Sequence, residues 1–284
     1  LRGSQRRRIL ETGRLMDRFD LSAEVAVVTG AQGKLGPVWL EALLDAGASV
    51  LALDRPGIAV SAEFQRLTAR FGHGRLAPAS ADVCCRAELE AALEQCRQTF
   101  GLPTVLVNNA GIDAPPAADG KGYRLEEIPL ETNLRILEVN AAGLFLVTQV
   151  FGGAMARAGR GTVINIGSLY ASVSPDARLY DHIPMTPPFI KPPAYGAAKA
   201  AVVNLTKYLS THLAPYGVRV NTLSPGGVLG GQDPEFKRKF CERVPLGRMA
   251  TADDLRGPLL FLASRASAYV TGINLKVDGG FTVW

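Results

Sequence analysis

The sequence has few of the residues that build disulfide or metal centres. Among 284 residues there are four cysteines and three histidines. Cys84 and Cys85 are neighbours, Cys96 and Cys241 stand alone, and no cysteine has another cysteine or a histidine at the spacing of a metal-binding motif. We therefore expect reduced thiols, no metal ion and a cytoplasmic protein.

Long apolar runs are missing, and so is a strongly charged body. No stretch of about 18 uninterrupted apolar residues occurs, so the sequence predicts no membrane-spanning helix. The net charge is +5, but residues 1–18 hold six arginines against two acidic residues and contribute +4, which leaves +1 for the rest. Because a nucleic-acid-binding domain carries its excess positive charge on its folded surface, we expect neither nucleic acid nor a membrane as a partner.

The basic head over residues 1–18 is expected to lie outside the folded domain. It lacks the apolar segment of a secretory signal. Its arginines suit a disordered electrostatic arm, a transit-like leader, or residues that precede a natural start at Met16. We favour the last, because Met16 stands just ahead of the first apolar run. The domain is then expected over residues 19–284.

The rest of the chain has the composition of a globular protein, with 47% apolar and 20% charged residues. Short β-branched runs alternate with longer segments of helical period, which indicates βαβ units. We predict a single α/β domain: a Rossmann-type, doubly wound, seven-stranded parallel sheet in a three-layer α/β/α arrangement. The expected strands are 25–29, 49–53, 75–79, 104–107, 162–166, 219–223 and 274–277, and the expected helices are 35–46, 62–71, 86–100, 131–157, 194–213 and 253–262.

Two proline-rich segments interrupt this alternation, at residues 113–129 and 174–193. Proline at such density continues neither a helix nor a central strand. Both segments are therefore predicted to be surface loops, either next to a site or without a function.

A glycine turn joins the first expected strand to the first expected helix, with residues 30–36 reading Gly-Ala-Gln-Gly-Lys-Leu-Gly. Such a turn lets the backbone approach a pyrophosphate and presents the amino end of the helix to its charge, although a turn without a ligand can look the same. Asp54 follows 18 residues after Gly36, where a carboxylate that binds the ribose 2′-hydroxyl is expected, and this favours NAD over NADP. The adjacent Arg55 is a residue that could accept a 2′-phosphate instead.

Further motifs follow in order along the chain: Asp82-Val83, Asn108-Asn109-Ala110-Gly111, Asn140, Ile166-Gly167-Ser168, Tyr195-Gly196-Ala197-Ala198-Lys199, Pro225-Gly226 and Val277-Asp278-Gly279-Gly280. With the glycine turn, they make residues 19–284 resemble the single-domain branch of the short-chain dehydrogenase/reductase family. Lys34 departs from the commonest pattern, because a glycine usually stands there, and the resulting spacing is more similar to the sugar-nucleotide branch. A threonine common after Val228 is also replaced, by Gly230-Gly231.

The resemblance implies a cofactor site and a catalytic set. Ser168 would hydrogen-bond the substrate oxygen, Asn140 would belong to a water-linked proton path through Lys199, and the nicotinamide would carry the hydride, so no metal is needed. The implied catalytic residues are Asn140, Ser168, Tyr195 and Lys199. The implied cofactor-binding residues are Gly30, Gln32, Gly33, Lys34, Leu35, Gly36, Asp54, Arg55, Asp82, Val83, Asn109, Ala110, Gly111, Tyr195, Lys199, Pro225, Gly226 and Val228.

Tyr195 and Lys199 also form a pair by helical geometry. Residues four apart lie on one helix face, and an ammonium near a phenol favours the phenolate, so Tyr195 is predicted to be the general acid/base. Tyr180 is nearer the family's usual distance from Ser168, but Pro184 stands where its lysine would have to be. The long interval is therefore interpreted as an insertion over about 174–193, whose Arg178, Tyr180, His182 and Phe189 are candidate lid or substrate contacts.

The sequence thus predicts an NAD(P)-dependent oxidoreductase that interconverts a secondary alcohol and a ketone, with a polar or sugar-like small molecule as substrate. Residues 226–248 have the glycine-rich, then charged-helix character of the family's substrate-covering segment, and the apolar end 269–284 suits subunit contacts in a homotetramer or homodimer. Two alternatives stay open: a sugar-nucleotide dehydratase or epimerase that uses bound NAD, suggested by the glycine spacing, and a nucleotide-binding protein without catalysis. The complete Ser168, Tyr195 and Lys199 set argues against the second.

Overall fold

Apolar runs of four to eight residues pair into one parallel sheet. The computed structural model describes residues 15–114, 116 and 122–284, and this part of the chain forms a seven-stranded sheet of order β3-β2-β1-β4-β5-β6-β7. The order reverses between β1 and β4, which makes the sheet doubly wound. The predicted α/β fold is therefore confirmed. The strands are β1 Val25–Thr29, β2 Ser49–Asp54, β3 Leu76–Ser80, β4 Val105–Asn108, β5 Gly161–Ile166, β6 Val218–Pro225 and β7 Asn274–Val277.

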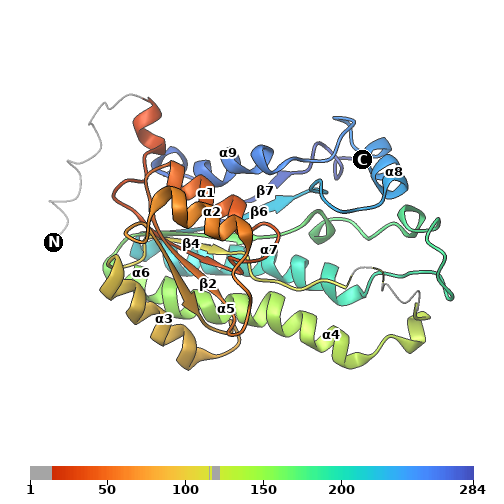
Figure 1. Cartoon of the computed structure of the whole chain (residues 1–284), viewed down its shortest axis with the longest axis horizontal. Helices are drawn as coiled ribbons and strands as arrows, with labels where there is room; N and C mark the ends of the chain where they lie inside the picture. Colours follow the sequence, from red (N-terminus) through yellow and green to blue (C-terminus); the bar gives the residue numbers. More distant parts are fainter. Residues whose placement is uncertain (1–14, 115, 117–121) are drawn as a thin grey trace.

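Helices cover both faces of this sheet and give the three layers of Figure 1. Successive strand residues point to opposite faces, so Val28 packs with α1, α2 and α9, whereas Val27 packs with α3, α5 and α6. This explains why the central strands β1, β2 and β4 are largely apolar on both faces instead of alternating, whereas β6 and β7 also carry polar residues such as Asn221 and Lys276. The helices are α1 Gly36–Asp45, α2 Ala62–Phe71, α3 Arg86–Thr99, α4 Leu130–Leu137, α5 Leu144–Val147, α6 Gly153–Ala158, α7 Pro193–Leu213, α8 Pro234–Glu242 and α9 Ala252–Ala263.

The long helix predicted over 131–157 exists but contains two wider turns. Helices α4, α5 and α6 follow one another without a break, separated by π-helical segments at Glu138–Gly143 and Thr148–Gly152. Among residues 15–114, 116 and 122–284, the continuous helix Leu130–Ala158 is the one long and apolar enough to span a membrane, and 61% of its apolar window is buried in the protein. Its apolar face is thus largely explained by packing against the sheet.

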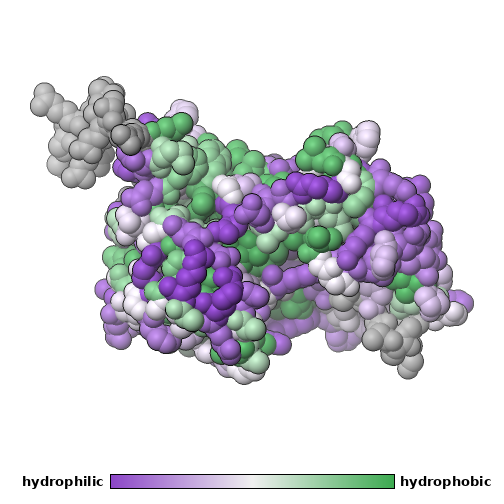
Figure 2. All heavy atoms as spheres, turned by 45° about the horizontal axis from the view of Figure 1, so that its top comes forward, coloured by the Kyte–Doolittle hydropathy of each residue, from purple (hydrophilic) through white to green (hydrophobic). Residues whose placement is uncertain are grey.

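Segment 174–193 packs against α8, which lies in the stretch 226–248 whose later part was predicted from the sequence to have a charged-helix character. Leu179 and Phe240 are buried in a separate apolar cluster, and the tilted rings of Tyr180 and Phe236 have centroids 5.3 Å apart. Ion pairs surround the cluster, such as Asp176 with Arg243. In Figure 2 the right-hand end of the molecule, where α8 lies in Figure 1, is mostly hydrophilic. The segment is therefore a packed part of the fold.

Candidate active site

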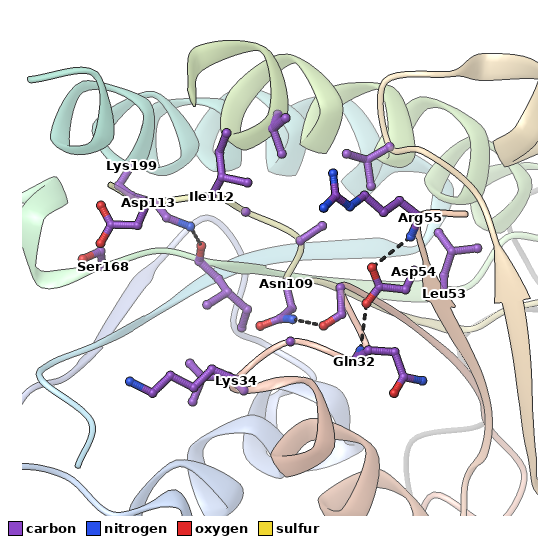
Figure 3. A pocket seen from close by; sticks show the side chains of 18 of the residues that line it. Gln32, Lys34, Leu53, Asp54, Arg55, Asn109, Ile112, Asp113, Ser168 and Lys199 are labelled. Atoms are coloured by element: carbon purple, nitrogen blue, oxygen red, sulfur yellow. Dashed lines mark hydrogen bonds between the residues drawn. The ribbon is translucent and has the colours of Figure 1, made fainter. Parts of the chain in front are cut away.

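A cavity of about 610 Å³ opens at the carboxyl ends of the strands, beside the reversal between β1 and β4 (Figure 3). This is where doubly wound sheets bind their ligands. Gly36 and Asn140 lie behind its wall. The other residues named for the site line it: Gly30, Gln32, Gly33, Lys34, Leu35, Asp54, Arg55, Asp82, Val83, Asn109, Ala110, Gly111, Ser168, Tyr195, Lys199, Pro225, Gly226 and Val228.

The glycine turn requires glycine at two positions for different reasons. Gly30 has φ +64°, and a Cβ there would lie 2.8 Å from the Cα of Ala110. At Gly36 a Cβ would lie 2.3 Å from the carbonyl oxygen of Ala31. Gly36 therefore lets α1 start close against the turn, which brings the amino end of the helix to the cavity.

Trp39 and Asn109 hold the glycine turn in place through hydrogen bonds. The indole Nε1 of Trp39, which is fully buried, donates to Oδ1 of Asn109 at 2.8 Å. The Nδ2 of Asn109 then donates to the carbonyl oxygens of Thr29 and Gly30 at 3.0 and 2.9 Å. The Asn109 amide is thus oriented by its neighbours and holds the turn, while its residue borders the cavity.

Asp54 ends β2 at one end of the cavity, as Figure 3 shows. Its Oδ2 accepts a hydrogen bond from the backbone N–H of Gln32 at 2.8 Å, and its Oδ1 accepts one from the backbone N–H of Arg55 at 2.9 Å. The carboxylate is therefore fixed between the glycine turn and the end of β2, in the position from which it could accept hydrogen bonds from a ribose.

Lys34 crosses from the glycine turn to the segment after β6. A Cβ placed on Gly230 would lie 3.0 Å from Nζ of Lys34, so the glycine leaves room for the ammonium. Nearby, Nε2 of Gln232 donates to the carbonyl oxygen of Val228 at 2.8 Å and shapes this segment. The two departures from the family pattern, a lysine in the turn and glycines after Val228, thus fit together in space.

The catalytic candidates gather at the opposite end of the cavity. Tyr195 and Lys199 lie one turn apart on α7, and Ser168 follows β5. The Nζ of Lys199 donates to the carbonyl oxygen of Ile166 at 2.8 Å. These three side chains come from α7 and from the end of β5, and all three line the same end of the cavity.

Asn140 lies behind Gly111, which separates it from the ammonium of Lys199. Its Oδ1 accepts from the N–H of Ile112 at 2.7 Å, and its Nδ2 donates to the carbonyl oxygen of Ile112 at 2.8 Å. A Cβ on Gly111 would lie 3.2 Å from Oδ1 of Asn140 and 3.7 Å from Nζ of Lys199. The π-helical segment therefore places Asn140 close behind Lys199, with only a glycine between them.

Burial favours the neutral forms of both Tyr195 and Lys199. It raises the pKa of Tyr195 to about 12, with a smaller contribution from the charge of Asp113, while a hydrogen bond with Ser168 lowers it. Burial also lowers the pKa of Lys199 to about 8, and Asp113 acts in the opposite direction. The raised pKa of Tyr195 is opposite to the lowering that its spacing from Lys199 predicted, because burial is the largest influence on the phenol.

The residues of segment 174–193 that were expected to form a lid point elsewhere. Within the described part of the chain, Arg178, Tyr180, His182 and Phe189 do not line the cavity. Arg178 pairs with Asp176, and Nε2 of His182 lies 2.7 Å from Oδ1 of Asp233 at the start of α8. The rings of Tyr180 and Phe189 meet edge to face. Tyr180 and His182 therefore dock the segment through Phe236 and Asp233, whereas Arg178 pairs within the segment.

Other residues at the cavity were not predicted from the sequence. Ile112, Asp113 and Arg135 line it. Asp113 had a weak signal, since it stands two residues after the Asn109-Ala110-Gly111 motif, whereas Trp39 appeared only as an apolar helix position. No group of three or more potential metal ligands occurs among the described residues.

The residues present fit a dinucleotide. One end of the cavity offers a carboxylate at Asp54, the middle a glycine turn with the start of α1, and the other end Ser168, Tyr195 and Lys199. This combination defines a dinucleotide-binding α/β protein with a site for proton transfer.

Known proteins resemble the chain over nearly its full length. The family model for enoyl-(acyl carrier protein) reductases matches residues 35–282. A galactitol 2-dehydrogenase (L-tagatose-forming) from Cereibacter sphaeroides is 33% identical over 276 residues, covering 94% of this chain and 98% of that protein. A gluconate 5-dehydrogenase from Burkholderia cenocepacia J2315, solved with NADP and tartrate, has TM-score 0.80 and 31% identity, covering 95% and 99% of the two chains. A short-chain dehydrogenase from Leptospira borgpetersenii, solved with bound NAD+, has TM-score 0.78 and 31% identity, covering 96% and 97%.

The chain belongs to the short-chain dehydrogenase/reductase family. It is an NAD(P)-dependent oxidoreductase that interconverts a secondary alcohol and a ketone on a polar substrate.

Proposed function

We propose that this protein oxidises a secondary hydroxyl of a polyhydroxylated small molecule to a ketone, and catalyses the reverse reaction, with NAD as its cofactor. The observation that carries the proposal is the single cavity that joins Asp54 at one end to Ser168, Tyr195 and Lys199 at the other. Galactitol and gluconate, the substrates in the names of two similar proteins, are both polyhydroxylated. The test is a screen of polyols, aldonates and the corresponding ketones with NAD and NADP in parallel, in which turnover appears as a change in NADH absorbance.

In this proposal each catalytic residue has one task. Tyr195 accepts the hydroxyl proton during oxidation and returns it during reduction, Ser168 holds the substrate oxygen, and Lys199 supplies positive charge beside the phenol. Asn140 holds the backbone at Ile112 and lies behind Lys199, at the start of a path by which the proton reaches solvent. The bound nicotinamide supplies the hydride acceptor or donor.

The cofactor contacts are proposed from the positions of the lining residues. Asp54 would accept hydrogen bonds from the adenosine ribose, and Asp82 and Val83 would border the adenine. The glycine turn with Lys34 would hold the pyrophosphate, because its backbone and the Lys34 ammonium face the cavity from the start of α1. Pro225, Gly226 and Val228 would border the nicotinamide at the end of β6.

The preference for NAD is proposed to depend on the charge of Asp54. We expect Asp54→Asn to reduce kcat/KM for NAD about 10-fold and to raise the relative efficiency with NADP, because a neutral amide no longer repels the 2′-phosphate. Steady-state kinetics with both cofactors measure this. Arg55→Ala is the matched control, in which NADP use should fall and NAD use should stay. A ratio that is the same in Asp54→Asn and the wild type would contradict the assignment.

We also propose a cytoplasmic homotetramer or homodimer. Three large apolar side chains near the carboxyl terminus support subunit contacts, because Tyr269 is fully exposed and Val283 and Trp284 are largely exposed in the single chain. Large apolar side chains that are exposed in a single chain can be covered by a second subunit.

A further inference from the structure

Two charged residues meet beside the catalytic candidates, one from each proline-rich segment. Nζ of Lys191 lies 2.6 Å from Oδ2 of Asp113. Lys191 comes from the segment 174–193, just ahead of α7, whereas Asp113 follows β4. The two segments that interrupt the βα alternation therefore join at the cavity.

The ammonium of Lys191 is enclosed, whereas the carboxylate of Asp113 is accessible. The side chain of Lys191 is 5% exposed, and that of Asp113 is 40% exposed. Nζ of Lys191 lies 4.9 Å from the ring centroid of Tyr195 and 5.7 Å from that of Tyr170, and these two rings meet edge to face. Two aromatic rings and one carboxylate thus hold the cation in place.

Asp113 is the member of the pair that a substrate would meet. It lines the cavity with Ser168, Tyr195 and Lys199, and Figure 3 shows it beside Ser168 and Lys199 at the end away from Asp54. Its Oδ1 accepts the backbone N–H of Ala114 at 2.8 Å, while Oδ2 faces Lys191. Among the residues that the structure describes, each oxygen has one donor, which leaves a lone pair on each for a further hydrogen bond.

We propose that Asp113 is a specificity-determining residue that accepts a hydrogen bond from a substrate hydroxyl near the reacting carbon. Its charge selects neutral polyols and ketoses over sugar acids, and Lys191 is the positioning residue that holds it. This proposal rests on the proposed function and narrows its substrate class.

The charges of Asp113 and Lys191 support selection of neutral substrates over anionic ones. A carboxylate has no proton to donate near neutral pH, so it pairs with a hydroxyl and not with another carboxylate. An anionic substrate would approach the exposed Asp113 charge, while the opposite charge of Lys191 is buried behind it. Although the Asp113 side chain is partly exposed, its charge acts at short range on a substrate in the cavity, and this repulsion discriminates between substrates of the same size and different charge.

Segment 174–193 takes part in this proposal through Lys191 alone. Other charged residues of the segment pair with α8 or with the residue just before it. His182 pairs with Asp233, and Asp181 pairs with Lys239 of α8. The docking of the segment on α8 fixes its backbone, and Lys191 then reaches across to Asp113. No residue of segment 174–193, which the structure describes in full, lines the cavity, but Lys191 places its positive charge against Asp113, which does line it.

The test compares galactitol with gluconate, both six-carbon compounds, in the wild type, Asp113→Asn, Lys191→Met and Lys191→Arg. Wild-type kcat/KM should favour galactitol. In Asp113→Asn we expect the KM for galactitol to rise about 10- to 100-fold with a smaller change in kcat, and the preference over gluconate to narrow, because a charge-assisted hydrogen bond and a repulsive charge are both removed. Lys191→Met should also raise the KM for galactitol, because Asp113 is no longer held in place, but it leaves the Asp113 charge uncompensated, so the discrimination against gluconate should persist. Lys191→Arg should restore part of the wild-type KM for galactitol.

Lys239→Met is the matched control, because it removes another largely buried ammonium that docks segment 174–193 and lies outside the cavity lining. It should leave the substrate preference unchanged, and circular dichroism should show that each variant is folded. A wild-type preference for gluconate, or an equal loss for both compounds in Asp113→Asn, would overturn the proposal.

Calorimetric binding to the NADH-loaded protein separates this proposal from the proposed function. If galactitol and other four- to six-carbon polyols bind in an Asp113-dependent way without turnover, the oxidoreductase proposal fails and the Asp113 assignment stands. If no polyol binds and none is turned over, the Asp113 assignment fails.

Discussion

Replacing Tyr195 with phenylalanine is expected to lower kcat/KM by about 10²- to 10⁴-fold, the range that general acid/base catalysis contributes. The change removes one oxygen from a buried side chain that lines the cavity with Ser168 and Lys199. Because the ring remains, the packing against Tyr170 should persist. NADH binding, followed by fluorescence, should change little, whereas steady-state rates in both directions should fall.

Tyr180→Phe is the matched control for this prediction. Tyr180 is the rival in sequence spacing, but its ring packs edge to face on Phe189 and at a tilt on Phe236, in the apolar cluster beside α8. Burial raises its pKa far above the usual range, and it lies outside the cavity lining that the structure describes. The variant should keep nearly full activity. Equal losses in the two variants would mean that Tyr195 has no special role.

The fold was predictable because its signals are local. Most strands are short, mainly apolar runs, and the predicted strand bounds differ from the observed ones by at most two residues. Gly30 and Gly36 were recognisable because the turn leaves no room for a Cβ at either position. Helix α8 was predicted only as a charged-helix character within 226–248, without bounds, since its apolar side has just Phe236, Phe240 and a few neighbours to signal it.

The part of the site that depends on distant contacts was not predictable. Trp39 braces Asn109 from 70 residues away, and Lys191 meets Asp113 from 78 residues away. A tryptophan on an apolar helix face and a lysine among prolines carry no mark of these partners in the sequence. Arg178 and His182 looked more like substrate contacts because they are polar and lie in the same loop, yet Arg178 pairs with Asp176 of its own segment and His182 with Asp233 at the start of α8.

We expect Lys199 to lower the stability of the folded protein, although the proposed reaction requires it. Burial lowers its pKa from 10.5 to about 8, so the folded state disfavours the charged form that the unfolded chain keeps. Below pH 8 this corresponds to a cost of about 3 kcal/mol in the free energy of unfolding. Lys199→Met removes the cost and also the hydrogen bond to the carbonyl of Ile166, worth about 1 kcal/mol. We therefore expect the variant without cofactor to be about 2 kcal/mol more stable at pH 7 and catalytically inactive.

The pH dependence gives the sign of this effect. Between about pH 8 and 10.5 the unfolded chain binds more protons at Lys199 than the folded chain does, so wild-type stability rises with pH in that window. The advantage of Lys199→Met should shrink across the same window and reverse above it. Urea unfolding at several pH values measures the difference, and Lys207→Met, at an exposed position on α7, is the control that should show no such trend. A wild type more stable than Lys199→Met at pH 7 would mean that the ammonium is well solvated or paired in the folded protein. The positive charge of Lys199 would then not lower the free energy of unfolding, as a buried charge kept for proton transfer is expected to do.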